Sequence, residues 1–352
     1  MKKFRIVFPA LAAALLLVFA LSGCGSSENV LKLFNYGDYM SDELIAQFEK
    51  ESGIRVRQDT FDTNEDMYEK VAGGQTQWDL IIAGDYTIEK MIEKDLLQPL
   101  NISAFSNYGN LDKDYMAKLA AADPGNKYAI PYTWGTVGIL YNTKWIPEGS
   151  ITSWKDLWNP AYKEHGILMQ DSVRDTFMVA EMILGIDMNT TKEDDLKKVV
   201  DLLMQQKSIV AGWKNDEARD DLIEGNAGIG MIYSGEYLYC LEKNEDLAFC
   251  IPKEGTNVWF DCFVIPKNAK NVTAAEKFID FMLRAESGYE TFEHLGYPIP
   301  NSAATALMEE EYNTDENIFP SQEILNKCAV FHYLGTEGDE LLTKYWKQYR
   351  GN

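Results

Sequence analysis

The sequence predicts an α/β fold arranged in two domains, and two observations support this. The chain has 352 residues, of which 46% are apolar and 25% are charged, so it can bury a large core and fill two domains. From residue 30 onward, short apolar runs typical of strands alternate with amphipathic runs typical of helices. This alternation favours a mostly parallel sheet with right-handed crossover connections.

The strand–helix order is clearest at the start of this region. Ser41 is a candidate N-cap with acidic residues directly after it, and Gly53 has the position of a C-terminal helix stop. Asn64 is expected to cap the second helix. Strands are expected at 30–35, 54–57 and 79–83.

The remainder of the chain continues the same rhythm. Strands are expected at 136–141, 167–169, 229–233 and 259–266, and helices at 192–207, 216–224, 273–284, 287–295 and 339–350. No repeat and no Pro/Ser-rich linker separates the two halves. The chain is therefore expected to cross between its domains on ordered segments.

The N-terminus has the pattern of a lipoprotein signal peptide. A basic stretch at 2–5 precedes an apolar run at 6–21, which is shorter than the ~20 residues of a membrane-spanning helix. Leu21-Ser22-Gly23-Cys24 then resembles the lipobox of bacterial lipoproteins. The resemblance implies that 1–23 is removed, that Cys24 is lipidated and that 24–29 is a tether. The chain is expected at the extracytoplasmic face of the cell membrane.

The composition is acidic, with 55 Asp and Glu residues against 33 Lys and Arg residues and a net charge of −22. Without the first 23 residues the net charge is near −25. Such a surface repels nucleic acid, so no nucleic-acid partner is expected, and it mildly concentrates cations. Solubility alone would also explain the acidity.

Four further cysteines follow Cys24, and none of them has C-x-x-C spacing, so no metal site is expected. Outside the cytoplasm they are compatible either with disulfides or with buried free thiols. These residues are Cys240, Cys250, Cys262 and Cys328.

Aromatic residues stand beside carboxylates at three points where strands are expected to begin or end. The segments are Tyr36-Gly37-Asp38-Tyr39, Asp85-Tyr86 and Trp259-Phe260-Asp261. A carboxylate next to a π-face suits an organic ammonium ion, because the acid takes its charge and N–H donors while the ring covers its methylenes. In α/β sheets, ligands bind beyond the carboxyl ends of strands. Trp259 and Asp261, two residues apart on a strand, face the same side.

These segments and three others, in unbroken order along the chain, resemble the spermidine/putrescine-binding proteins of polyamine ABC importers. The other segments are Ile130-Pro131-Tyr132-Thr133-Trp134-Gly135-Thr136, Ser153-Trp154-Lys155-Asp156-Leu157-Trp158 and Gly296-Tyr297-Pro298-Ile299-Pro300-Asn301. The resemblance implies a two-lobed, type II periplasmic-binding-protein fold with a ligand cleft between the lobes. Lobe one would comprise 30–134 plus 260–303, and lobe two 135–259 plus 304–352.

The same resemblance implies a function and a set of ligand contacts. The protein would be a monomer that captures polyamine by hinge closure and delivers it to an ABC permease, without a cofactor and without enzymatic activity. Asp175 and Asp261 match acids that bind ligand nitrogens in the family. The other expected ligand-binding residues are Tyr36, Asp38, Tyr39, Asp85, Tyr86, Tyr233, Trp259 and Tyr297, of which Asp85 has the weakest support.

Several positions depart from the family pattern. Many members carry Trp at Tyr36 and Tyr233, Glu at Asp38 and an acid at Ser172, and Phe331 replaces a polar residue of spermidine binders. The ligand class is therefore expected to be polyamine, with its length open between putrescine and spermidine.

Two alternative functions have less support in the sequence. An exported hydrolase would need a located pair of carboxylates, and neither a histidine metal spacing nor a G-x-S-x-G elbow is present. A binder of another solute with the same fold is the second alternative. A sugar site would need neutral hydrogen-bonding groups more than several acids.

Overall fold

A computed structural model describes residues 29–74, 77–215 and 217–351, so Cys24 and the expected signal peptide lie outside the described residues. Nine strands of this part form one sheet in the order β2-β1-β3-β9-β4-β7-β5-β6, with β8 paired to β4. One half contains β1 (Val30–Tyr36), β2 (Arg55–Phe61), β3 (Leu80–Gly84) and β9 (Val258–Val264). The other contains β5 (Ile167–Met169), β6 (Val210–Trp213), β7 (Ile229–Tyr233) and β8 (Leu247–Cys250).

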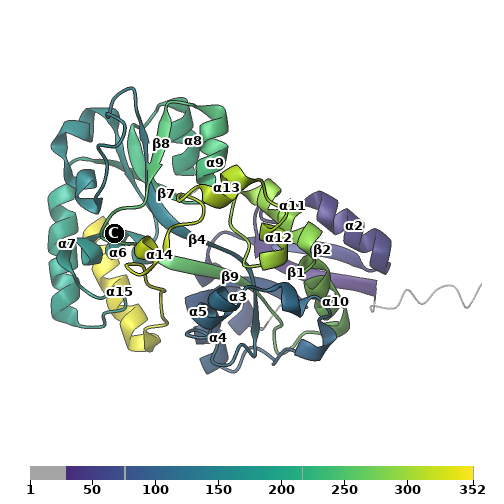
Figure 1. The fold of residues 1–352 in the computed structure, drawn as a ribbon. Coiled ribbons are helices and arrows are strands. Elements are labelled where there is room, and N and C mark those ends of the chain that lie inside the picture. Colours follow the sequence, from purple (N-terminus) through teal and green to yellow (C-terminus); the bar gives the residue numbers. More distant parts are fainter. Residues whose placement is uncertain (1–28, 75–76, 216, 352) are drawn as a thin grey trace, which may run out of the picture.

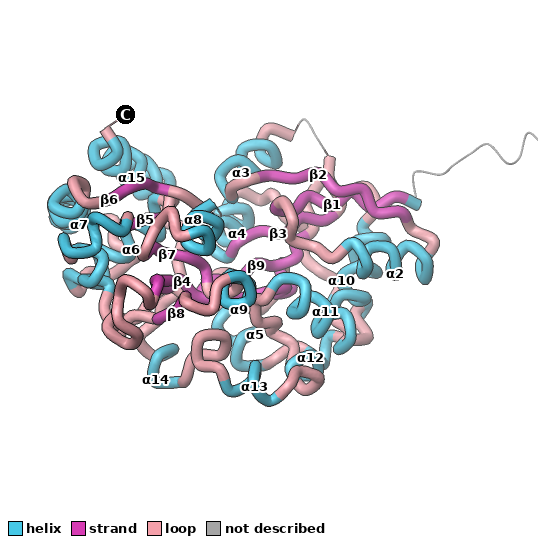
Figure 2. Tube along the Cα trace, turned by 90° about the horizontal axis from the view of Figure 1, so that it is seen from above, coloured by secondary structure: helices cyan, strands magenta, loops and turns pink. Residues whose placement is uncertain are grey.

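Helices flank each half of the sheet, as Figures 1 and 2 show. Around β1–β3 lie α2 (Asp42–Ser52), α3 (Asn64–Ala72), α4 (Asp85–Glu93), α5 (Lys113–Leu119) and α10 (Val272–Met282). Around β5–β8 lie α6 (Val173–Leu184), α7 (Glu193–Gln206), α8 (Glu217–Glu224), α9 (Glu236–Lys243) and α15 (Gly335–Arg350). Shorter elements include α11 (Ala285–Leu295), α12 (Ser302–Thr305), α13 (Glu310–Thr314), α14 (Gln322–Leu325), η2 (Ile102–Ala104), η3 (Tyr108–Asn110), η4 (Trp154–Trp158) and η5 (Pro160–His165).

Strand β4 (Ala129–Asn142) joins the two halves, and every one of its residues is buried. Its first part pairs with β9 and its second part pairs with β7 and β8. All of these pairings, and that of β3 with β9, are antiparallel, whereas β1–β2, β1–β3, β5–β6 and β5–β7 are parallel. The expectation of a mostly parallel sheet is therefore wrong at its centre, because β4 and β9 cross between the halves in opposite directions.

The local signals mark most element ends correctly. Ser41 caps α2 by accepting a hydrogen bond from the backbone N–H of Leu44, and Gly53 ends the helix at φ +69°. The cap of α3 is Thr63 and not Asn64, because the Thr63 hydroxyl accepts from the Asp66 N–H. The last helix begins four residues earlier than predicted, at Gly335.

Separate apolar clusters fill the two halves. One cluster packs β1, β3 and the end of β9 against α2 and α10, around Leu33, Phe263 and Phe278. Another packs the second part of β4 and β7 against α6 and includes the fully buried Trp154. Trp134, where β4 crosses between halves, is also completely buried, so it serves the core. The α/β class and its strand–helix rhythm are confirmed.

Candidate functional site

The middle of the sheet brings the predicted acid Asp261 next to the end of β3. Asp261 on β9 pairs with Gly84 on one side and with Thr133 of β4 on the other. The next residues after β1 form a turn that includes Tyr39. The strand-end rule thus places these segments together correctly.

Two tyrosines donate hydrogen bonds to the Asp261 carboxylate. The Tyr39 hydroxyl lies 2.8 Å from Oδ2 and the Tyr36 hydroxyl 3.4 Å from Oδ1. Tyr39 also lies 2.7 Å from the Thr133 hydroxyl. Burial raises the pKa of Asp261 to about 6, although the two tyrosine donors oppose this. A carboxylate so placed has a strong electrostatic demand for a cation.

Asp175 is the second buried acid, and it belongs to the other half of the sheet. It lies in the first turn of α6, where Ser172 caps the helix by accepting from the Asp175 N–H. Its Oδ2 accepts from the Tyr233 hydroxyl at 3.1 Å. Its Oδ1 is buried and has no hydrogen-bond partner among the described residues. Burial raises the pKa of Asp175, so this oxygen is a free acceptor with a desolvated charge.

Aromatic rings connect these two acids in a continuous series of edge-to-face contacts. From Tyr39 the series runs to Tyr297, with ring centroids 6.0 Å apart, and then to Trp259 at 5.2 Å. Trp259 contacts Tyr233 at 6.0 Å, and Tyr233 reaches Asp175. We call this series the aromatic wall. It places π-surface between two carboxylates, the arrangement that an apolar chain with a positive charge at each end requires.

Asp85 and Tyr86 lie beside this wall at the start of α4. Asp85 is 2% exposed and accepts hydrogen bonds from the backbone N–H groups of Tyr86, at 2.7 Å, and Phe260, at 3.2 Å. Burial raises its pKa to about 7 despite these donors. Asp85 therefore joins α4 to β9, and both of its oxygens already have donors.

The profile of the bacterial extracellular solute-binding protein family matches residues 43–320, most of the chain. The chain belongs to this family. A spermidine/putrescine-binding periplasmic protein of Salmonella typhimurium is 34% identical over 319 residues, which cover 90% of this chain and 91% of that protein. Two solved structures each cover 92% of this chain and are covered to 99%. One, from Listeria monocytogenes and described as a spermidine/putrescine ABC transporter, is 38% identical with a TM-score of 0.86. The other, the spermidine/putrescine transporter substrate-binding protein PotD of Streptococcus pneumoniae, is 36% identical with a TM-score of 0.81.

These likenesses confirm that this solute-binding protein has the predicted two-lobed fold. Lobe one is built around β1–β3 and lobe two around β5–β8. Asp261 lies on the lobe-one side of the wall and Asp175 on the lobe-two side. Relatives in the family are binding proteins of transporters.

One predicted site residue of the solute-binding protein does not join the others. Asp38 is exposed, has a φ of +29°, and its side chain makes no hydrogen bond to another of the described residues. Aspartate tolerates this left-handed region better than most residues. Its observed role is to form the turn that directs Tyr36 and Tyr39 toward Asp261.

Two charged residues at the site were not anticipated from the sequence. Glu65, in the first turn of α3, accepts the Tyr86 hydroxyl at 3.0 Å. The guanidinium of Arg174 lies 5.7 Å from the centre of the Tyr86 ring and 4.3 Å from that of Phe331. Arg174 is 7% exposed, and burial lowers its pKa. Its position directly before Asp175 was the available signal, but a sequence does not show which arginines are buried.

Two glycines lie directly against the aromatic wall. A Cβ at Gly135 would lie 2.5 Å from the indole of Trp259, and a Cβ at Gly235 would lie 2.2 Å from the ring of Tyr297. Real Cβ atoms do not approach other heavy atoms so closely, so both rings rest on bare backbone. These glycines fix how deep the two rings sit.

Replacing Gly235 with alanine is expected to lower the free energy of unfolding by about 1–3 kcal/mol, because the added methyl group displaces the Tyr297 ring. The backbone at Gly235 is in the ordinary helical region, so the loss would come from overpacking alone. Thermal unfolding measures it, with Gly109→Ala as the control, since a methyl group at Gly109 would meet no atom within 4 Å. Equal unfolding midpoints for the two variants would contradict this account.

The cysteines and the helices offer no other chemistry at this site. Cys240, Cys250, Cys262 and Cys328 are free thiols. Within 29–74, 77–215 and 217–351, no group of three or more His, Cys, Asp or Glu side chains could hold a metal ion. In the same described ranges, no helix has the length and apolar character needed to cross a membrane.

Proposed function

We propose that this solute-binding protein captures a polyamine, putrescine or spermidine, outside the cytoplasm and delivers it to an ABC permease. The observation that carries the proposal is the pair Asp175 and Asp261, one from each lobe, at opposite ends of the aromatic wall. The named relatives bind spermidine and putrescine.

The chemistry of a polyamine fits this arrangement. Its amines have a pKa of about 10 and are cationic at neutral pH. A buried ammonium must be paired, because an uncompensated charge costs several kcal/mol. Asp261 would pair with one ammonium group, and the free Oδ1 of Asp175 would accept a hydrogen bond from another. The methylenes between them would lie along Trp259 and Tyr297.

The remaining predicted residues take supporting roles in this proposal. Tyr39 and Tyr233 would orient the two acids, as their hydrogen bonds indicate. Tyr36 and Tyr86 would cover the ligand. Asp38 would add negative potential at the entrance, and Asp85 would hold α4 against β9 so that Tyr86 faces the site.

Ligand binding would also close the two lobes. In the absence of a cation, two desolvated carboxylates from opposite lobes repel each other, and a dication removes that repulsion and attracts both. Closure would occur by a hinge at the crossovers of β4 and β9. A permease would then recognise the loaded form by the relative position of the lobes.

The proposed lobe boundaries are 30–134 plus 260–303 for lobe one and 135–259 plus 304–352 for lobe two. Support comes from the separate apolar clusters on either side of the β4 crossover, including the packing of α15 against α6 and α7. Residues in 285–330 pack against both lobes, with Phe292 in a lobe-two cluster and Phe319 beside a lobe-one cluster. This part would move least during closure.

We further propose that the mature protein is a monomer that begins at Cys24 and is held by a lipid on that residue. The support is the lipobox-like sequence at 21–24 and the extracellular family. The intact mass of the protein extracted from membranes tests this, and a mature chain that starts at another residue would contradict it.

Calorimetric titration of the chain from residue 25 onward tests the proposed function. Putrescine or spermidine is expected to bind tightly in a one-to-one complex, because the site offers paired carboxylates and a covering wall. A neutral sugar is the control ligand. If neither polyamine gives heat while the sugar binds, the proposal fails and a sugar site replaces it.

A further inference from the structure

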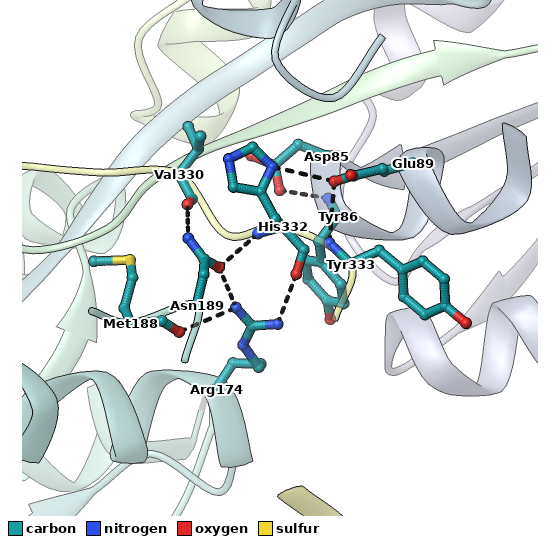
Figure 3. Close-up of polar contacts among 9 residues, drawn as sticks. All are labelled: Asp85, Tyr86, Glu89, Arg174, Met188, Asn189, Val330, His332 and Tyr333. Atoms are coloured by element: carbon teal, nitrogen blue, oxygen red, sulfur yellow. Dashed lines mark hydrogen bonds and ion pairs between the residues drawn. The ribbon is translucent and has the colours of Figure 1, made fainter. Parts of the chain in front are cut away.

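Glu89 makes a polar contact that the ligand site does not use. It lies on α4, one turn after Asp85 and Tyr86 (Figure 3). Its Oε2 accepts a hydrogen bond from the backbone N–H of Tyr333 at 3.0 Å and lies 3.2 Å from Nδ1 of His332. The contact joins residues more than 240 positions apart in the sequence.

The segment that Glu89 holds is fastened to lobe two. Asn189 donates to the carbonyl of Val330 at 2.9 Å and accepts from the N–H of His332 at 2.8 Å. Arg174 donates to the carbonyl of His332 at 3.0 Å and to Asn189 at 2.8 Å. The segment then enters α15, which packs on α6 and α7. Since α4 packs in lobe one, the contacts of Glu89 connect the two lobes.

A second contact runs parallel to the first. Lys90 bonds to Asp339 of α15 at 3.0 Å and lies 4.2 Å from the ring centre of Tyr68. A groove of about 470 Å³ opens beside this contact, with walls from α3 and α4 on one side and from α15 on the other. The lobes therefore meet here through polar contacts and not through an apolar core.

The contacts of Glu89 end next to the ligand acids. Arg174, which anchors the far side of the 330–333 segment, directly precedes Asp175 and faces the ring of Tyr86. The first turn of α4 and the first turn of α6 each carry site residues, and this network sets their separation. A change in that separation would misplace Tyr86 relative to Asp175.

We propose that Glu89 is a positioning residue that clasps the lobes in the closed, loaded form and slows ligand release. This inference rests on the proposed function. Glu89 and its partners can bond only while the lobes are together, so the bonds add to the stability of the closed form and not of the open form. Opening must break them before ligand leaves, whereas a ligand entering the open form does not meet them.

The test compares Glu89→Ala, Glu89→Gln and Glu93→Ala with the parent chain. Glu93 is the matched control, because it lies one turn further on α4 and pairs only with the neighbouring Lys94 among the described contacts. Stopped-flow tryptophan fluorescence with putrescine and with spermidine gives the association and dissociation rates. Circular dichroism melting establishes that each variant is folded.

Glu89→Ala is expected to raise the dissociation rate about tenfold, since a hydrogen bond to a charged group is lost, while the association rate changes less than about twofold. Glu89→Gln should fall between, because its amide oxygen can still accept from Tyr333. Glu93→Ala should match the parent. An unchanged dissociation rate in Glu89→Ala, or an equal change in Glu93→Ala, would overturn the clasp.

Hydrogen exchange at the Tyr333 amide provides a measurement that does not depend on the ligand. Exchange there should be faster in Glu89→Ala than in the parent, and unchanged in Glu93→Ala. If the parent binds neither polyamine, the proposed function fails, and this exchange comparison alone decides the clasp. Equal exchange in all three chains would reject it.

Discussion

Replacing Asp261 with asparagine is expected to weaken polyamine binding by roughly a hundredfold or more. The variant keeps an oxygen that can accept from Tyr39 but loses the charge that pairs with the ammonium. Removing one partner of a desolvated ion pair costs about 3–5 kcal/mol. Asp261 is only partly buried, which places the expected loss near the lower end of that range. Calorimetric titration with both polyamines measures it.

The same variant is expected to fold as well as the parent, or better. Burial raises the pKa of Asp261, which means that the folded protein without ligand is destabilised by its charge at neutral pH. Asparagine removes that penalty, so the unfolding midpoint at pH 8 should stay level or rise. Asp201→Asn is the control, because Asp201 is exposed on α7 and carries the same charge. An affinity of Asp261→Asn equal to that of Asp201→Asn would remove Asp261 from the site.

The contrast between Asp261 and Asp38 shows how far local sequence patterns reach. Both acids stand between aromatic residues near a strand end. Strand periodicity predicts that Asp261 and Trp259 share a face, and the structure places both at the site. No such periodicity governs a turn, where a φ of +29° leaves Asp38 exposed. The pattern identified the right segments, and backbone geometry decided which acid entered.

Contacts between distant segments explain most of what the sequence did not predict. Glu89 and His332 are separated by 243 positions, and neither stands in a motif. The antiparallel centre of the sheet was missed for a similar reason, because the pairing of β4 with β9 joins segments that local periodicity treats independently. Asp175 is intermediate. Its place at a helix start was visible in the sequence, but its selection as a ligand acid depended on the family resemblance.

The acids of the site should also make polyamine binding depend strongly on pH. Burial raises the pKa of Asp261 to about 6 and that of Asp85 to about 7, and it raises the pKa of Asp175 as well. An ammonium ion stabilises only the ionised form of a carboxylate, so binding lowers these pKa values and releases protons. Affinity should therefore be constant above about pH 7.5 and fall below it, by up to about tenfold per pH unit for each group that must ionise.

The stability of the ligand-free protein should change in the opposite sense. The folded pKa values lie above the unfolded value of about 3.9, so the folded state holds these protons more tightly. The resulting stabilisation is complete below about pH 4 and is lost as the pH rises through 6 and 7. Ligand-induced increases in the unfolding midpoint should accordingly grow between pH 5 and pH 7.5.

Calorimetry and thermal unfolding across pH 5 to 8, in one ionic strength, measure both effects. Asp261→Asn serves as the reference chain, since it lacks one titrating acid and should show a shallower slope of affinity against pH. Exposed carboxylates titrate near pH 4 and cannot produce a transition between 6 and 7. A parent affinity that stays constant down to pH 5 would mean that the buried acids do not contact the ammonium groups, and it would exclude the proposed pairing.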